Sequence, residues 1–150
     1  MEKWKEIASQ RDIDELLSLC EDFHDACIVS MRYQSGAFVD DRKAMHCGSS
    51  YEYELLVVFH SQGKPKTIEL CFSGLRRLHL TGWQDNYFCN IEDAHVSFYD
   101  DLLPGDPGKV IVWADCRDFD TKKLDHIIRE PSNTYIVANA LKWRIAPNHE

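Results

Sequence analysis

The chain has 150 residues, 44% hydrophobic and 28% charged, a composition typical of one globular domain that buries about two-thirds of its unfolded surface. Its net charge of −8 argues against a nonspecific nucleic-acid binder, which would need a basic groove. No apolar run approaches the roughly 20 residues that cross a bilayer, and the N-terminus is charged. We therefore expect a single cytoplasmic domain, residues 1–150, that binds neither nucleic acid nor membrane.

The first predicted element is an amphipathic helix. Asp12 can cap this helix, and Glu15 completes a capping-box pattern. The apolar residues that follow recur at i, i+3, i+4 and i+7, which makes one stripe of about two turns. We expect the helix to end near Asp22 and to lie on the sheet that follows. The stripe consists of Ile13, Leu16, Leu17 and Cys20.

Strand patterns begin directly after this helix. From Cys27 the hydrophobic period is two, which places Val29 on the same face and Ser30 on the other. Residues 40–50 are polar and predict a loop. Residues 51–60 predict a strand, and the apolar side chains on both of its faces toward its end are typical of a central, covered strand.

The rest of the chain predicts further strands. Residues 61–65 form a hairpin turn into a strand at 67–72, and Gly74 permits a kink or a bulge before another strand that ends at Gly82. The remaining predicted elements are strands at 88–99, 110–114 and 134–145, a Pro- and Gly-rich turn at 103–108, and a short helix on Leu124, Ile127 and Ile128 that Pro131 ends.

These elements predict an α+β fold. We expect a mostly antiparallel sheet of six or seven strands with the N-terminal helix packed on it. Two arrangements of the sheet stay open at this point, a curved half-barrel and a sandwich.

Six cysteines are spread along the chain without a CxxC pair. In a cytosolic protein such residues stay reduced, and a free cysteine behaves as a small apolar residue. We predict six thiols, most of them structural, and no bound cofactor. The six are Cys20, Cys27, Cys47, Cys71, Cys89 and Cys116.

The His24-Asp25 pair is one candidate site, because adjacent imidazole and carboxylate ligands are used by metal hydrolases. Such a site needs at least two further ligands, for which His46 and Cys47 are the candidates. A separate zinc set, Cys20, His24 and Cys27 with a fourth ligand from His46-Cys47, has a spacing that differs from zinc ribbons and fingers. The structural interpretation is that Asp25 bonds backbone amides at the start of a strand while His24 packs where helix and sheet meet. A small metal-dependent enzyme or metal-binding protein is therefore the alternative function.

Acidic residues cluster around the predicted turns near the fifth and sixth strands. If the sheet brings these loops to one end, they form a negative face with aromatic anchors, which suits the docking of a basic protein. The rival interpretation is a solvated loop end. Because the chain lacks GxSxG, GxxxxGK and GxGxxG motifs, we favour a noncatalytic protein-interaction module over an enzyme. The candidate binding residues are Asp100, Asp101, Asp106, Trp113, Asp115, Asp118 and Phe119.

Three segments carry a family resemblance: Phe23-His24-Asp25-Ala26-Cys27-Ile28, then Tyr33-Gln34-Ser35-Gly36-Ala37-Phe38-Val39-Asp40, and late in the chain Ala140-Leu141-Lys142-Trp143-Arg144. With these motifs the chain resembles a family of small uncharacterised bacterial proteins, some of which are similar to immunity proteins of polymorphic toxin systems. The resemblance spans most of the chain. It implies a class of function, the neutralisation of a toxin by binding, but no site residues and no reaction.

Overall fold

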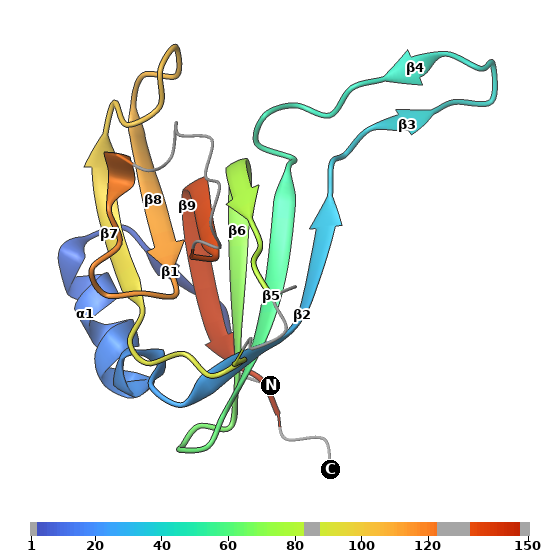
Figure 1. Cartoon of the computed structure of the whole chain (residues 1–150). Coiled ribbons are helices and arrows are strands. Elements are labelled where there is room, and N and C mark those ends of the chain that lie inside the picture. The colour runs from blue at the N-terminus through green and yellow to red at the C-terminus, as the bar shows by residue number, and fades with distance from the viewer. Residues whose placement is uncertain (1–2, 83–87, 123–132, 148–150) are drawn as a thin grey trace.

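The computed structural model describes residues 3–82, 88–122 and 133–147, and in this part the chain has an α+β fold (Figure 1). Its main element is one seven-stranded antiparallel sheet, which stays open and does not close into a barrel. The described part also contains a separate two-stranded hairpin, one α-helix and one 3-10 turn. The predicted fold class and the predicted number of strands are confirmed.

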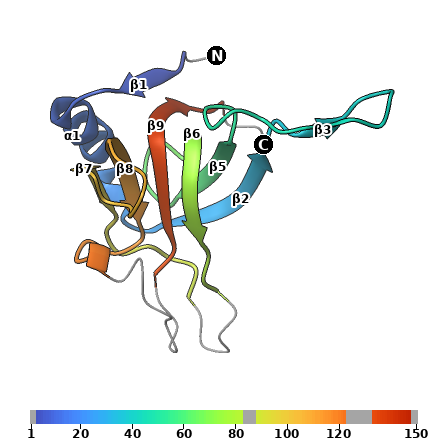
Figure 2. The same ribbon diagram turned by 90° about the horizontal axis from the view of Figure 1, so that it is seen from above.

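The strands of the sheet are β1 (Lys5–Ile7), β2 (Ala26–Gln34), β5 (Glu54–Ser61), β6 (Thr67–His79), β7 (His95–Asp100), β8 (Lys109–Ala114) and β9 (Tyr135–Ile145). Their spatial order is β2-β5-β6-β9-β8-β7, so β2 and β7 form the edges. Strand β9 joins the two halves, because it pairs with β6 on one side and with β8 and β1 on the other. Figure 2 shows that this single sheet is curved.

The helix α1 (Gln10–Leu19) has a different cap from the predicted one. The Ser9 hydroxyl accepts a hydrogen bond from the Asp12 N–H, and the Asp12 carboxylate accepts one from the Ser9 N–H, at 3.3 and 3.1 Å. The capping box therefore joins Ser9 to Asp12, and the helix starts earlier than expected. The predicted apolar stripe is confirmed, since Ile13 and Leu16 are fully buried. The helix ends at Leu19, before the predicted Asp22.

The sheet is covered on both faces in its central part. The larger core lies on the α1 face, where Phe59 and Trp113 are fully buried. A smaller core lies on the opposite face under the chain that follows β8, and it contains Val112 and Phe119. Neighbours such as Val112 and Trp113 belong to different cores because successive side chains of a strand point to opposite faces.

Strand β2 departs from the predicted alternation because it contains a bulge between Ile28 and Ser30. Such an extra residue shifts the side chains beyond it to the other face of the strand. As a result Ile28 and Met31 both pack against the core, whereas Val29 at the bulge is exposed.

Strand β6 replaces the two strands predicted on either side of Gly74. The strand continues through this residue, with a bulge between Leu75 and Arg77. Gly74 has a φ of +65°, and a Cβ atom there would lie 2.8 Å from Nδ2 of Asn139 on β9. Glycine is therefore needed at this position both for its backbone conformation and for the close approach of β9.

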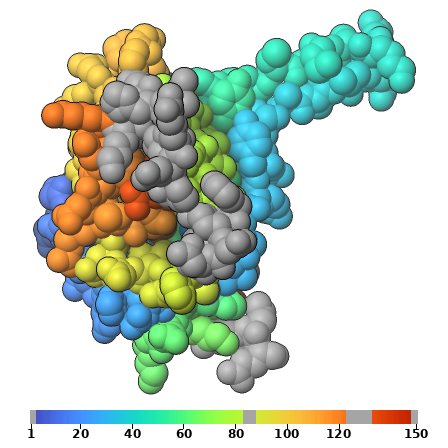
Figure 3. Space-filling model, viewed as in Figure 1, coloured from blue at the N-terminus to red at the C-terminus, as the bar shows by residue number. Residues whose placement is uncertain are grey.

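Residues 40–50 are mostly turn and irregular structure, as predicted, but Met45 and His46 form one strand of a hairpin that we did not predict. Strand β3 (Phe38–Val39) pairs with β4 (Met45–His46), and the hairpin projects from the end of β2 (Figures 1 and 3). We call residues 35–50 the arm. It arises because two short apolar stretches flank a polar turn, a pattern too short to distinguish from a loop by sequence.

Other predicted elements differ in extent. The strand predicted at 88–99 begins only at His95, and β1, which pairs with β9, has no predicted counterpart. The predicted helix on residues 124–128 lies outside the described residues. No helix in the described ranges has the length and apolar character needed to cross a membrane.

All six cysteines are free thiols, as predicted. Only Cys20 and Cys71 are buried, and this burial raises the pKa of Cys20 to about 12 and that of Cys71 to about 11. These two thiols therefore stay protonated and unreactive near neutral pH. The other four are partly or fully exposed, so burial in the core accounts for only two of the six.

Candidate functional site

The connection between α1 and β2 is a left-handed turn. Glu21, Asp22 and Phe23 have φ angles of 52°, 58° and 60°. Asp25 follows with a φ of 59°. Since each non-glycine residue in this conformation costs about 1–2 kcal/mol, packing elsewhere must compensate. We call residues 21–25 the left-handed turn.

The side chain of Phe23 holds this turn against the sheet. It is only 1% exposed, and its ring centroid lies 4.9 Å from that of Phe59 and 5.9 Å from that of Trp113. Full burial of such a side chain stabilises the fold by about 1.5–3 kcal/mol. The ring therefore offsets part of the strain, and the neighbouring Asp22 and His24 remain at the surface.

The segment before β7 lies alongside the left-handed turn. Ile91 exchanges two backbone hydrogen bonds with the end of the turn and the start of β2, at 2.9 and 2.8 Å. The N–H of Ala94 donates to the carbonyl of Asp22 at 2.8 Å. These bonds set the position of Glu92 and Asp93, which lie between them in the sequence. Two segments far apart in the chain thus form one surface.

His24 is held within this surface. Its Nδ1 donates to the backbone carbonyl of Glu92. Its Nε2 lies 3.4 Å from the Asp25 carboxylate, and Nδ1 lies 3.8 Å from that of Asp93. The carbonyl of Glu92, then the charges of Asp25 and Asp93, raise the pKa of His24. The imidazolium form is therefore favoured more than in a solvated histidine.

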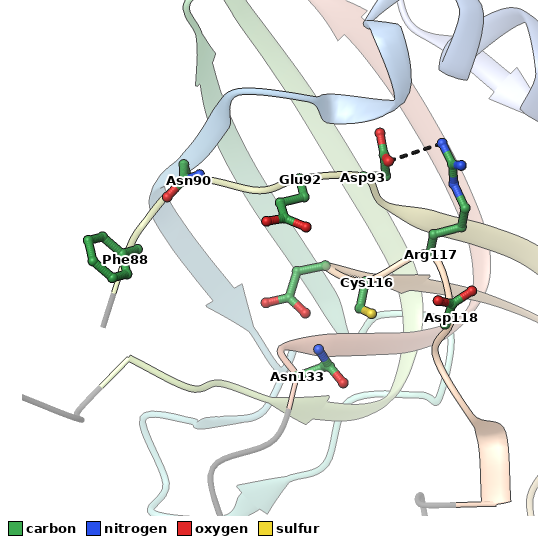
Figure 4. Close-up of a pocket in the computed structure, with 9 residues that line it drawn as sticks. Phe88, Asn90, Glu92, Asp93, Cys116, Arg117, Asp118 and Asn133 are labelled. Carbon is green, nitrogen blue, oxygen red and sulfur yellow. Dashed lines mark ion pairs between the residues drawn. The ribbon is translucent and has the colours of Figure 1, made fainter. Parts of the chain in front are cut away.

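Arg117 connects a third segment to the same surface. One nitrogen of its guanidinium lies 3.0 Å from the carboxylate of Asp93 and 3.6 Å from that of Asp22 (Figure 4 shows the first pair). Arg117 follows β8, so these contacts join the loop after β8 to the left-handed turn and to the segment before β7. Exposed pairs of this kind contribute about 0–1 kcal/mol, and their main effect is on side-chain orientation.

A hollow of about 650 Å³ opens beside Arg117 (Figure 4). Among the described residues that line it, four are acidic and one is basic. We call it the acidic hollow. Its charged residues are Glu92, Asp93, Asp115, Asp118 and Arg117, and Phe88, Asn90, Cys116 and Asn133 complete the lining.

Asp115 is the least solvated carboxylate of the acidic hollow. Burial raises its pKa, and the backbone of Thr134 and the side chain of Asn133 offset only part of this effect. Its Oδ1 is buried and has no hydrogen-bond partner among the residues that the structure describes. An ionised carboxylate with a buried, unpaired oxygen destabilises the folded state. Ionisable groups with such perturbed pKa values are enriched at functional sites.

The predicted acidic surface is divided between two ends of the sheet. Asp100 and Asp101 lie at the turn between β7 and β8, whereas Asp115 and Asp118 follow the opposite end of β8. A six-residue strand spans roughly 20 Å. The first group also has local structural roles: Asp101 accepts a hydrogen bond from the Gly108 N–H at 2.8 Å.

Asp106 belongs to the same β7–β8 turn. Its carboxylate lies 2.7 Å from Nε of Arg76, in a partly buried pair. This contact ties the turn to β6. Asp106 is therefore also outside the acidic hollow, and of the predicted acidic residues only Asp115 and Asp118 line it.

The two predicted aromatic anchors are not available at the surface. Trp113 is fully buried in the larger core, and Phe119 is 8% exposed. The ring of Phe119 packs 5.2 Å from that of Tyr135, under the loop that follows β8. Both faces of β8 are covered, so the prediction that these aromatics act as exposed anchors is wrong.

The four residues of the metal interpretation are not brought together. His24 and Asp25 are neighbours in the left-handed turn, but His46 and Cys47 lie in the arm (Figure 1). His46 instead pairs with Asp40 at 2.8 Å. Within the described ranges, no group of three or more His, Cys, Asp or Glu residues is placed to hold a metal ion.

Sequence reasoning missed the residues that connect the three segments. Asp22, Asp93 and Arg117 are ordinary surface residues by pattern, and no spacing relates them. The alternation that places Ala94 with Val96 could have located the start of β7. It could not have shown that the preceding residues dock against the left-handed turn.

No known protein family matches the chain, and neither does any curated protein or solved structure. From its structure alone, the chain is an α+β protein with an open antiparallel sheet and an acidic hollow at one end. The resemblance to small bacterial proteins of the immunity type stays a prediction from the motifs.

Proposed function

We propose that this protein is a noncatalytic interaction module that binds a basic protein partner at the acidic hollow. In this proposal it acts in the bacterial cytoplasm as an immunity-type protein, which neutralises a toxin by covering the surface that the toxin needs. The resemblance of the His24-Asp25 and Gly36 segments motivates the immunity class. The observation that carries the binding site is the concentration of carboxylates around one hollow.

Charge complementarity supports a basic partner. The four carboxylates of the hollow lie near those of Asp22 and Asp25 on the left-handed turn. His24 links the turn to the hollow, because its imidazole lies near both Asp25 and Asp93. A lysine or arginine side chain of a partner that enters the hollow would meet several carboxylates and only one competing cation, Arg117, among the lining residues described. Such complementary charges accelerate association and select the partner.

Two destabilising features support a binding role over a solvated loop end. The left-handed turn holds four non-glycine residues at positive φ, and the half-buried Asp115 leaves one oxygen without a partner in the described part of the chain. Strain and unsatisfied polar groups of this kind concentrate at binding and active sites. A cationic group of the partner beside Asp115 would remove the second cost.

The test compares two double charge reversals in capture from a lysate of the source bacterium. Glu92→Lys/Asp118→Lys changes the hollow, and Asp14→Lys/Asp100→Lys makes the same change in net charge at exposed positions outside it. We expect the wild type and the second variant to retain one basic protein in a stoichiometric complex. The first variant loses it, and salt weakens the complex over about 0.05–0.5 M.

Either of two results would contradict this proposal. One is equal capture by both variants, which would move the binding surface away from the hollow. The other is stoichiometric metal without a protein partner in the same samples, which would instead favour a metal role for His24 and Asp25. Circular dichroism of both variants shows whether the fold is intact.

A further inference from the structure

The arm and the adjoining edge strand concentrate the exposed apolar side chains of this protein. Of the ten large apolar side chains that are exposed in the described part of the chain, six lie between residues 29 and 51. Met45 is 73% exposed and Phe38 57%. A concentration of exposed apolar side chains in one region of a fold is typical of an interaction site. The six are Val29, Tyr33, Phe38, Val39, Met45 and Tyr51.

The arm is held in a defined shape by its own contacts. Asp40 Oδ1 accepts the N–H groups of Arg42 and Ala44, both at 2.9 Å, and its Oδ2 pairs with His46 at 2.8 Å. The ring of Phe38 stacks on His46, with centroids 4.5 Å apart and planes 6° from parallel. The arm therefore presents its apolar side chains from a preorganised hairpin, which lowers the entropy cost of binding.

Strand β2 offers an open backbone edge beside the arm. It is the terminal strand of the sheet, and the bridge from Ala26 to Ile91 covers only its first residue. The bulge at Val29 interrupts the edge next. The stretch 30–34 remains, and no described strand pairs with its outer side. Its outward N–H and C=O groups can pair with a further strand.

The charge of this region indicates what covers it. Residues 26–50 contain three basic and two acidic residues, a net charge of +1, whereas the rest of the chain has 14 basic and 23 acidic residues, a net charge of −9. Two copies of such an acidic chain repel each other through most of their surfaces. They can approach where the surface is apolar and nearly neutral, as it is here.

The tip of the arm is also self-complementary. Asp41 precedes Arg42 and Lys43, so two arms that meet around a two-fold axis set the acid of each against the bases of the other. A two-fold interface uses the same patch on both subunits. A patch with acids and bases in near balance suits a second copy better than a strongly charged partner.

We propose that this protein forms a symmetric dimer through the arm and the outer edge of β2, with a second copy of the chain as the occupant. Residues 30–34 of the two copies pair antiparallel and extend the sheet. Each arm, which leaves the end of β2 sideways beyond the edge (Figures 1 and 3), then covers part of the other copy. The acidic hollow is lined by other segments and stays open.

The first test is the mass in solution, measured by light scattering on the full chain at up to about 100 µM, where a dimer with a Kd of about 10 µM is well populated. We expect about 35 kDa, twice the 17.4 kDa of the chain. Met45→Asp should weaken the dimer at least tenfold. Leu80→Asp is the matched control, because Leu80 is 59% exposed directly after β6, two strands in from the β2 edge; its dimer should equal that of the wild type.

The second test separates self-association from simple hydrophobic clustering. Lys43→Asp places a third acid at the tip and should weaken the dimer, whereas Asp41→Lys/Lys43→Asp restores the balance of charge and should restore the dimer. A mass of 17.4 kDa for the wild type at every concentration would overturn the proposal. So would a dimer that is unchanged in Met45→Asp, or a double variant that dissociates as readily as Lys43→Asp.

Discussion

Arg117 and Asp93 form an ion pair with 3.0 Å between nitrogen and oxygen, and this pair joins the loop after β8 to the segment before β7. The same guanidinium nitrogen lies 3.6 Å from the carboxylate of Asp22 in the left-handed turn. Asp93 in turn lies 3.8 Å from Nδ1 of His24. One basic side chain thus orients carboxylates from two other segments at the rim of the acidic hollow. A substitution of Arg117 or Asp93 should therefore alter the surroundings of His24.

We predict that His24→Gln destabilises the protein more at low pH than at high pH. The folded state raises the pKa of His24 above the ordinary value of 6.5, so its contribution to stability is complete below pH 6.5. This contribution is lost as the pH rises through the raised pKa of the folded state. Thermal melts of wild type and variant at about pH 5.5 and 8.5 measure it.

NMR titration of the imidazole provides the companion measurement. Asp93→Asn should lower the pKa of His24 toward 6.5, because it removes one of the charges that raise it. Asp118→Asn is the control, since Asp118 is exposed and is not one of the groups that raise the pKa of His24. An identical titration curve in wild type and Asp93→Asn would show that the two groups do not interact in solution.

We predict that Asp115→Asn stabilises the protein at neutral pH. Burial raises the pKa of this carboxyl, so the folded state disfavours the ionised form. The penalty is absent when Asp115 is protonated at low pH and appears as the pH rises through its raised pKa. The variant should therefore melt about 2–4 °C above the wild type at pH 7, and the two should converge below about pH 4.

The matched control for this measurement is Asp118→Asn, which removes the same charge from an exposed residue of the same loop. Its melting temperature should stay close to that of the wild type at both pH values. If Asp115→Asn were less stable than the wild type at pH 7, the ionised carboxylate would have a stabilising partner, and the argument from burial would be wrong.

We predict that Glu21→Gly raises the free energy of unfolding by up to about 1 kcal/mol. Glu21 is exposed and has a φ of 52°, a conformation that glycine adopts without the steric cost of a Cβ atom. Chemical denaturation measures the change. Ser18→Gly, on the exposed side of α1, should instead lower stability by about 0.5 kcal/mol. Equal losses in both variants would show that the turn is not strained in solution.

We predict that Gly74→Ala destabilises the fold by about 1–3 kcal/mol. The new Cβ would need a φ of +65° and would contact Asn139 at 2.8 Å. Gly105→Ala isolates the first effect, because Gly105 has a φ of +75° and a Cβ atom there would meet no described atom within 4 Å. Denaturation should show the larger loss for Gly74→Ala. Equal losses would mean that β9 moves away from β6 at little cost.

The elements of this fold that the sequence predicts are those that follow from short-range patterns of apolar residues. The stripe of Ile13 and Leu16 defines α1, and the alternation of Leu55, Val57 and Phe59 defines β5, whose three residues are at most 1% exposed. These side chains are buried because the period of each element turns them to one face. The capping residue was missed because Ser9 with Asp12 and Asp12 with Glu15 have the same spacing, and only the backbone hydrogen bonds select between them.

Bulges and covered faces account for most of the errors. Whether a bulge forms at Val29 or beside Gly74 depends on the strand opposite. The sequence therefore predicts an uninterrupted alternation around Val29 and two separate strands around Gly74. Trp113 looked like a surface anchor because acidic residues follow it. It is buried because α1 and the left-handed turn cover that face of β8, a contact between segments that no local pattern encodes.

The candidate site likewise depends partly on local sequence properties and partly on long-range structure. By itself the sequence determined the α+β class, most strand positions, the acidic character of the chain and the mixed charge of the arm, since composition and periodicity are local properties. Only the tertiary structure decided that Asp22, Asp93 and Arg117 meet, that Asp100 and Asp115 lie at opposite ends of β8, and that the arm projects beyond β2. These relationships depend on strand order and register, which are set by long-range backbone pairing and by the burial of side chains from distant segments in a common core.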